Sequence, residues 1–258
     1  PDAGSTLVYM ALILVLYREG LSSNYLTIGI SAVVLFVLCE LYTEYVGAII
    51  WLLACGSYYY FLRRKKKILR KSMIVFATGL AYIASVSFVY NSIVLPHQKN
   101  RIDIILGNIQ DDYGVGYNLN QSTIAIGSGG FTGKGFLEGT RTKGDFVPEQ
   151  DTDYIFSTVG EEWGFIGSSG VIILFVVLFF RIIIVAERQK SNFSRIYGYA
   201  VASILFFHFA INIAMTIGLA PVVGIPLPFF SYGGSSLWGF TLLLFIFIKL
   251  DSARMDQL

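Results

Sequence analysis

Residues Gly144 to Phe165 read GDFVPEQDTDYIFSTVGEEWGF, and within them a polar loop changes into a membrane-like helix. The residues before this stretch are loop-like, because six glycines fall between Gly127 and Gly139 and almost no helical apolar period accompanies them. Asp153 stands where the loop becomes helix, so one side of its carboxylate faces water and the other a low-dielectric wall. Such a position can tune a carboxylate for acid/base chemistry, which makes Asp153 the first catalytic candidate.

The composition predicts a polytopic membrane protein. Hydrophobic residues make up 55% of the 258 residues and charged residues only 14%, which is outside the usual range of a soluble domain. The net charge of +2 is too small to indicate a nucleic-acid partner. Cys39 and Cys55 lie in apolar stretches without nearby His or Cys, which favours packing over a disulfide or metal site. Because the chain starts at Pro1 at the edge of an apolar run, we expect the C-terminal part of a longer protein.

Seven apolar stretches are long enough, or nearly so, for the roughly 20 residues that cross a bilayer. They are residues 3–17, 25–42, 45–62, 72–94, 154–186, 196–217 and 234–250. The predicted fold is therefore all-α, a polytopic integral membrane protein with about seven transmembrane helices. We expect one transmembrane domain over residues 1–258, interrupted by a large extracytoplasmic loop over residues 95–153.

The Lys and Arg residues of the short loops predict the orientation. If the run Arg63–Lys71 lies in the cytoplasm, 14 Lys and Arg residues lie inside and five outside. This assignment places residues 95–153 and 218–233 outside the cell. We interpret the run Arg63–Lys71 as a solvated face that sets the topology, with contact to anionic lipid as the alternative.

The glycine-rich stretch GSGGFTGKGF leaves two interpretations open. It is not a nucleotide phosphate loop, because that motif needs Gly where Ser128 stands and Ser or Thr where Gly135 stands. It is either a tightly turning surface loop or a set of backbone N–H groups that holds a pyrophosphate together with Lys134. In both cases glycine has no side chain in the way, so another part of the chain or a ligand can approach the backbone closely.

A second irregular segment, Leu219 to Ser236, reads LAPVVGIPLPFFSYGGSS. Its three prolines prevent a continuous helix, and the turn Gly233–Ser236 can cap the last span. Non-helical backbone near membrane depth is tolerated only inside protein or along a wet cavity. We therefore expect this segment to form one wall of the cavity that the Asp153 loop enters. His208 and Asn212 share a helix face in the preceding span, where we expect an interhelical hydrogen bond.

Four stretches together resemble the SEDS family, which is named for roles in shape, elongation, division and sporulation and includes FtsW, RodA and SpoVE. They are PDAGST (Pro1–Thr6), NQSTIAIGSGGFTGKGFLEGT (Asn120–Thr140), FVPEQDTDYIF with GEEWGFIG (Phe146–Gly167) and GIPLPFFSYGGSS (Gly224–Ser236). Their order, spacing and outer location agree with the family along nearly the whole chain. Thr152 makes this stretch resemble the elongation branch, RodA, more than the division branch, FtsW.

The resemblance implies a peptidoglycan glycosyltransferase of the bacterial plasma membrane. Such an enzyme polymerises lipid II into a growing glycan strand, releases undecaprenyl pyrophosphate and has its active site outside the cell. Asp153 matches the family's essential Asp and is the expected general base. The substrate-binding candidates are Lys134, Arg141, Gly133, Gly135, Ser231, Gly233 and Ser235, and the supporting acids are Asp2, Glu161 and Glu162. Asp2 or Glu162 could orient the partners of Asp153 or hold a divalent cation, Mg²⁺ or Mn²⁺. The expected partners are a class B penicillin-binding protein, other elongation-complex membrane proteins and membrane lipid.

Two features depart from the family pattern. The upstream Glu/Lys motif PSEFAK is absent, so we expect this chain alone to be inactive, and residues 25–62 read as an additional hairpin. One alternative is a flippase or transporter of a lipid-linked precursor, which needs a cytoplasmic opening and a paired acid deeper in the membrane. A second is a non-catalytic scaffold of the cell-wall synthesis complex, in which Asp153 is structural, for example as a helix N-cap.

Overall fold

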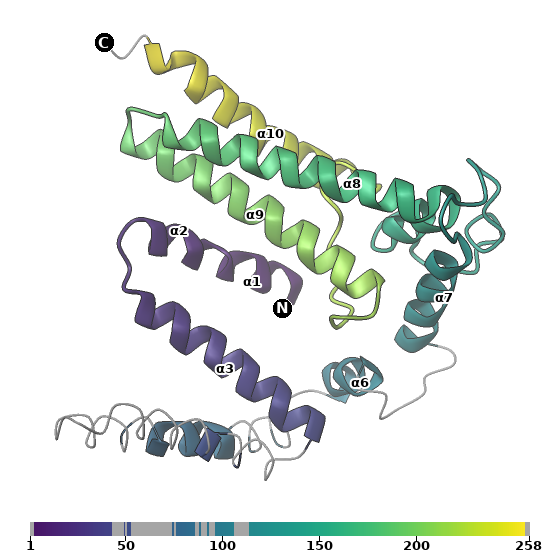
Figure 1. Ribbon diagram of the computed structural model, residues 1–258, viewed down its shortest axis with the longest axis horizontal. Helices are drawn as coiled ribbons and strands as arrows, with labels where there is room; N and C mark the ends of the chain where they lie inside the picture. The colour runs from purple at the N-terminus through teal and green to yellow at the C-terminus, as the bar shows by residue number, and fades with distance from the viewer. Residues whose placement is uncertain are drawn as a thin grey trace. The chain divides into compact units, whose positions relative to one another are not determined.

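The structure, a computed structural model, describes residues 3–42, 49, 51–52, 74, 76–85, 88, 92, 96–105 and 114–255. Every regular element in these residues is a helix, as the sequence predicts (Figure 1). The chain divides into two compact units, one of Pro1–Gly20 with Gly107–Leu258 and one of Leu21–Leu106. The first unit contains the Asp153 stretch.

Three helices of the described chain are long and apolar enough to cross a membrane, by length and composition. They are α8 (Ile155–Glu187), α9 (Asn192–Thr216) and α10 (Gly234–Ser252). These bounds confirm the predicted spans 154–186, 196–217 and 234–250 to within a few residues. At about 1.5 Å per residue, the 33 residues of α8 would extend for about 50 Å as one straight helix, longer than the roughly 30 Å of bilayer hydrocarbon, although Gly164 interrupts the helix near its start. One end of α8 must therefore project beyond the apolar layer.

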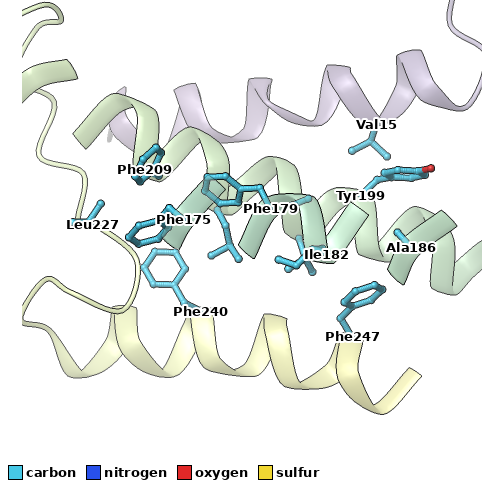
Figure 2. Close-up of a cluster of buried hydrophobic side chains, with 13 residues drawn as sticks. Val15, Phe175, Phe179, Ile182, Ala186, Tyr199, Phe209, Leu227, Phe240 and Phe247 are labelled. Carbon is cyan, nitrogen blue, oxygen red and sulfur yellow. The ribbon is translucent and has the colours of Figure 1, made fainter. Parts of the chain in front are cut away.

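The core of this unit surrounds α9. Of the most apolar 18-residue window of each long helix, 44% is buried in α9, against 22% in α8 and 11% in α10, so α9 is the central helix. Phenylalanines from α8, α9 and α10 interlock along it, as Figure 2 shows for Phe175, Phe179, Phe209 and Phe240. The rings of Phe175 and Phe209 lie 4.6 Å apart. Such contacts drive helix association where apolar surface alone cannot.

Two short helices, α1 (Ala3–Met10) and α2 (Leu12–Arg18), pack along α9. Val15 of α2 reaches the core, where it lies near Tyr199 in Figure 2. Together α1 and α2 fill the predicted span 3–17, although a turn at Ala11 separates them. The apolar run therefore forms helix, as expected, but in two pieces.

Ion pairs gather at the end of the helices where α2 stops, α8 stops and α9 begins. Arg18 pairs with Glu187 at 2.7 Å and Arg195 pairs with Glu19 at 3.0 Å. Arg188 pairs with Asp251 near the end of α10. The sequence predicted that the basic residues of these segments share one side of the membrane, and the pairs bring their chain ends together.

The second unit is described in part. Helix α3 (Ser23–Tyr42) covers the predicted span 25–42, and the Tyr82 hydroxyl donates to the Ala32 carbonyl at 3.0 Å. The predicted span 45–62 lies mostly outside the described residues, and the span 72–94 is described in part, chiefly over residues 76–85. The run Arg63–Lys71 and Cys55 lie outside the described residues. The total of seven spans therefore stays a prediction.

The predicted loop 95–153 contains two helices that its sequence did not indicate, α6 (Pro96–Ile105) and α7 (Val115–Ser128). Six of the 14 residues of α7 are Asn, Gln, Ser or Thr, and the helix packs against α8 and α9 through small buried residues, Gly116, Ser122 and Ala125. The Ser122 hydroxyl donates to the Thr216 carbonyl of α9 at 2.9 Å. Tertiary contacts of this kind, rather than an apolar stripe, account for the helix.

Candidate active site

The glycine-rich stretch docks on the first turns of α8 at a break in that helix. Gly164 has φ 62° and ψ −155°, a conformation that essentially only glycine adopts. At this break the N–H of Phe165 donates to the Gly130 carbonyl at 3.0 Å, and the N–H of Ile166 to the Phe131 carbonyl at 3.2 Å. A Cβ at Gly164 would lie 2.3 Å from the backbone nitrogen of Gly133. Glycine is thus required here because the backbone of the glycine-rich stretch lies in contact with the backbone of α8.

Glu161, three residues before the break, anchors the same loop. Its side chain is completely buried and its carboxylate accepts five hydrogen bonds. They come from Lys134 Nζ at 2.7 Å, the N–H groups of Arg141 at 3.0 Å and Thr142 at 2.8 Å, and the hydroxyls of Thr140 at 3.2 Å and Ser128 at 3.3 Å. Only an ionised carboxylate is purely an acceptor, so this set of donors fits the charged form.

The predicted pyrophosphate donors are already engaged within the fold. The N–H groups of Gly133, Lys134 and Gly135 donate to the carbonyls of Gly129, Glu161 and Glu162. The Lys134 ammonium is paired with Glu161 and also donates to Thr140. These contacts favour the surface-loop interpretation of the glycine-rich stretch over a phosphate cradle. A substrate-binding role for Lys134, Gly133 and Gly135 stays a prediction.

Arg141 differs from Lys134 in its charge balance. Its side chain is partly exposed and donates from Nη1 to the Gln121 side-chain oxygen of α7. Within the described residues no carboxylate pairs with the Arg141 guanidinium. A cation held by a neutral amide keeps its charge available for an anionic ligand.

Asp153 lies between the loop before α8 and the loop that follows α9. Its N–H donates to the Glu149 carbonyl at 3.0 Å, and its own carbonyl accepts from the Asn212 amide at 2.8 Å. A Cβ at Gly224 would lie 3.3 Å from Asp153 Oδ2, so the carboxylate faces the exposed backbone of the second loop. The N-cap of α8 is Tyr154, which makes no side-chain cap bond, so Asp153 precedes the capping position.

The two loops are joined in two further places. The N–H of Tyr232 donates to the Asp151 carbonyl at 2.7 Å. Tyr154 and Val147 form a small buried cluster with Ala125 of α7, against which Val222 packs. The expectation that the proline-containing segment adjoins the Asp153 loop agrees with these contacts.

A cavity of about 430 Å³ extends between the helices as far as Gly224 in the second loop. It lies between α1, α9, α10 and the second loop, and its polar lining includes His208 and Ser236. Gly224, which faces the Asp153 carboxylate, also lines it. The cavity is otherwise mainly apolar, which suits a ligand with a hydrocarbon part.

The remaining predicted residues have less defined surroundings. The Ser231 hydroxyl accepts from the Leu227 N–H at 2.8 Å, Gly233 is the N-cap of α10, and Ser235 is exposed. Glu162 is 8% exposed, and no described group hydrogen bonds to its carboxylate. Asp2 lies outside the described residues. Among the residues that the structure covers, no three His, Cys, Asp or Glu side chains form a metal-ligand group, so the divalent cation stays a prediction.

Sequence reasoning missed the partners that hold this site together. Ser128, Thr140, Thr142 and Gln121 contact Glu161 or Arg141, and nothing in their spacing indicates these contacts. Asn212 was predicted to bond to another helix but bonds to two loops. An Asn in an apolar span was the available signal, because its amide must find partners.

Comparison with known proteins gives one consistent result. The sequence model of the FtsW, RodA and SpoVE family, described as cell cycle protein, matches residues 46–255. The peptidoglycan glycosyltransferase MrdB of Escherichia coli K12 is 43% identical over 141 residues, which are 55% of this chain and 38% of that protein. The peptidoglycan glycosyltransferase RodA of Treponema pallidum is 38% identical over 166 residues, or 64% of this chain and 38% of that protein. The chain thus spans about two fifths of the length of these curated relatives.

A solved structure supports the same fold. One chain of the structure described as "Structural coordination of polymerization and crosslinking by a peptidoglycan synthase complex" matches 98% of this chain and 69% of its own length. The TM-score is 0.56 at 24% sequence identity. Since the family match also covers most of the sequence, the chain belongs to the FtsW, RodA and SpoVE family of cell cycle proteins, on its RodA-like side.

Proposed function

We propose that this chain is the part of a peptidoglycan glycosyltransferase that carries its general base, Asp153, and that the enzyme polymerises lipid II during cell elongation. The observation that carries the proposal is the place of the Asp153 carboxylate. It lies at the start of α8 and faces the exposed backbone at Gly224, beside a largely apolar cavity. The activity named for MrdB and RodA, and their identity to this chain, support it.

In the proposed reaction the Asp153 carboxylate accepts the proton of the GlcNAc 4-hydroxyl of one lipid II molecule. The oxygen then forms a bond to the anomeric carbon of the second sugar chain, while the bond from that carbon to the pyrophosphate oxygen breaks. The electron pair leaves with undecaprenyl pyrophosphate, and the product is a β-1,4 linkage. A positioned base contributes about 10²- to 10⁴-fold to such a step.

The leaving pyrophosphate requires positive charge, and Arg141 is the better of the two predicted cations. Its guanidinium has a neutral partner, Gln121, whereas the charge of Lys134 is balanced by Glu161. A preorganised cation directed at developing negative charge lowers the barrier without reorganisation. The apolar cavity beside Gly224 offers room for a segment of the polyprenyl chain. A divalent cation held near Glu162 would supply further positive charge.

The position of the carboxylates favours glycosyl transfer over transport of a lipid-linked precursor. In α8, α9 and α10 they lie toward the helix ends, with Glu161 and Glu162 near one end of the bundle and Glu187 and Asp251 near the other. A transporter with a midplane site would need an acid between them. We place the Asp153 end outside a bacterial plasma membrane, on the Lys and Arg bias of 14 to five. A class B penicillin-binding protein is the proposed partner through the membrane spans.

The test is lipid II polymerisation by the full-length protein carrying Asp153→Asn. Asn retains the shape of Asp but cannot act as a base near neutral pH, so we expect the rate to fall by at least about 10²-fold. Because Asp153 precedes the capping position, loss of its charge should change stability by at most about 1 kcal/mol. The matched control is Asp151→Asn, two residues away and exposed, which should keep nearly normal activity.

The control separates two kinds of failure. If Asp153→Asn polymerises lipid II at nearly the wild-type rate, Asp153 is not the base. If both variants lose activity equally, the loop is sensitive to any loss of charge and the assignment to Asp153 fails as well. Loss with Asp153→Asn alone, in protein of normal thermal stability, supports the proposal.

A further inference from the structure

Asn212 connects the two loops that meet at Asp153. It lies near the end of α9, its side chain is completely buried, and one amide nitrogen donates to two carbonyls. The acceptors are Asp153 at 2.8 Å and Ile225 at 2.7 Å, which are 72 residues apart in sequence. An Asn amide has two N–H donors, so both are used. Neither acceptor belongs to another helix.

The carboxylate of Asp153 lies beside this connection. Gly224 precedes the second acceptor, Ile225, and its Cα faces Asp153 Oδ2 closely enough that a Cβ would lie 3.3 Å away. Gly224 has φ 71°, which turns the chain here without a side chain in the way. The amide of Asn212 therefore holds backbone on both sides of the gap that the carboxylate occupies.

A purely structural role of Asn212 and a positioning role predict effects of different size on stability and on rate. Side-chain hydrogen bonds inside membrane bundles are individually weak, so their loss is expected to lower the melting temperature by only about 2 °C. Placement of a catalytic group is far more sensitive, because a shift of about 1 Å can lower a rate about 10²-fold. An effect on rate that exceeds the effect on stability thus distinguishes positioning from support.

We infer that Asn212 is a positioning residue, which fixes the Asp153 carboxylate by clamping its backbone to the loop at Ile225. This inference rests on the proposed function of Asp153. Substrate binding depends on other groups, among them Arg141. Loss of the clamp should therefore lower kcat and leave KM for lipid II nearly unchanged.

The experiment compares Asn212→Leu with Ser122→Ala in the full-length protein. The side chain of Leu has the same branching and number of heavy atoms as that of Asn, is somewhat bulkier, and has no donor. Ser122→Ala removes a buried hydrogen bond to α9 of similar length, 2.9 Å, whose acceptor is the Thr216 carbonyl and not Asp153 or Ile225. We expect Asn212→Leu to lower kcat by about 10- to 10²-fold with KM within about twofold, and Ser122→Ala to leave kcat unchanged. If Asn212→Leu yields no folded protein, Asn212→Ala, which cannot overpack the site, takes its place in the comparison.

Asp153→Asn is measured in the same assay so that the two proposals can fail separately. Activity of Asp153→Asn near the wild-type value would overturn the proposed base, whatever Asn212 does. An inactive Asp153→Asn together with a normal kcat for Asn212→Leu or Asn212→Ala would overturn the positioning role alone. Equal losses in the Asn212 and Ser122 variants would also overturn it, since they would reflect the packing of α9 in general.

Discussion

Replacing Glu161 by Gln keeps the size of a completely buried side chain and removes the charge on which the glycine-rich loop is fixed. In the native protein Oε1 accepts four hydrogen bonds, including the one from Lys134, and Oε2 accepts the N–H of Thr142. The amide of Gln has one acceptor oxygen. If that oxygen keeps the four donors, the NH₂ group faces the N–H of Thr142 and this donor loses its partner.

The expected free-energy cost of Glu161→Gln follows from the loss of two interactions, one with the N–H of Thr142 and one with Lys134. A buried N–H without an acceptor costs about 1–3 kcal/mol. Breaking a buried ion pair costs about 3–5 kcal/mol, but the side chain of Lys134 is 27% exposed and its ammonium can turn to water, so we assign about 1–2 kcal/mol to this loss. The sum is about 3 kcal/mol against closing of the loop on α8. Since 1.4 kcal/mol is a factor of ten, local opening should become about 10²-fold more frequent.

Amide hydrogen exchange of the full-length protein measures this directly. The N–H groups of Gly133, Lys134 and Gly135 are hydrogen bonded in the closed loop, so their exchange should accelerate about 10²-fold in Glu161→Gln. Exchange within α9 should not change. The control is Glu138→Gln, the same substitution at an exposed position of the same loop, where we expect native exchange. Native exchange in Glu161→Gln would refute the anchoring role of Glu161.

Three other predictions concern backbone contacts and topology. Gly224→Ala places a methyl group against the Asp153 carboxylate at a positive φ, so polymerisation should fall several-fold in a lipid II assay, with a stability loss of about 1–2 kcal/mol. Gly164→Ala would bring its Cβ 2.3 Å from the Gly133 nitrogen, so the yield of folded protein by size-exclusion chromatography should drop sharply, whereas Gly170→Ala, with open space around it, should be tolerated. A cysteine at Thr140 should react with an impermeant thiol reagent on intact cells; reaction only after lysis would invert the topology.

The long helices could be predicted from sequence because their signal is one of length and composition. An apolar run of about 20 residues has few alternatives to a spanning helix, whatever its neighbours are. The predicted and observed bounds of α8, α9 and α10 agree for this reason. The break at Gly164 could not be predicted, because a single glycine is tolerated inside membrane helices. It is a break here because the backbone of residues 130–133 occupies the space beside it.

The polar loop was harder to predict, since its order comes from contacts between distant residues. Helix α7 lacks an apolar stripe and is held by small residues against α8 and α9. The sequence left open whether the glycine-rich stretch holds a ligand or packs on the protein. Its N–H groups bond to carbonyls of the protein, which favours packing. Glu161 was expected to be a supporting acid, and the donors that converge on it come from five residues between Ser128 and Thr142.

Asp153 could be singled out from sequence because it stands at the boundary between polar and apolar segments, and such a boundary is visible without any structure. Its surroundings were not visible. The carboxylate faces Gly224, and its backbone is bound by Asn212, both from segments more than 50 residues away. Apolar patterning determines which residues enter the membrane, whereas the few polar groups left inside determine how the connecting loops meet. A buried amide such as that of Asn212 must satisfy its donors, and the two carbonyls that accept them belong to loops rather than helices. The same requirement that makes a polar residue costly in a membrane helix thus brings the two loops together at Asp153.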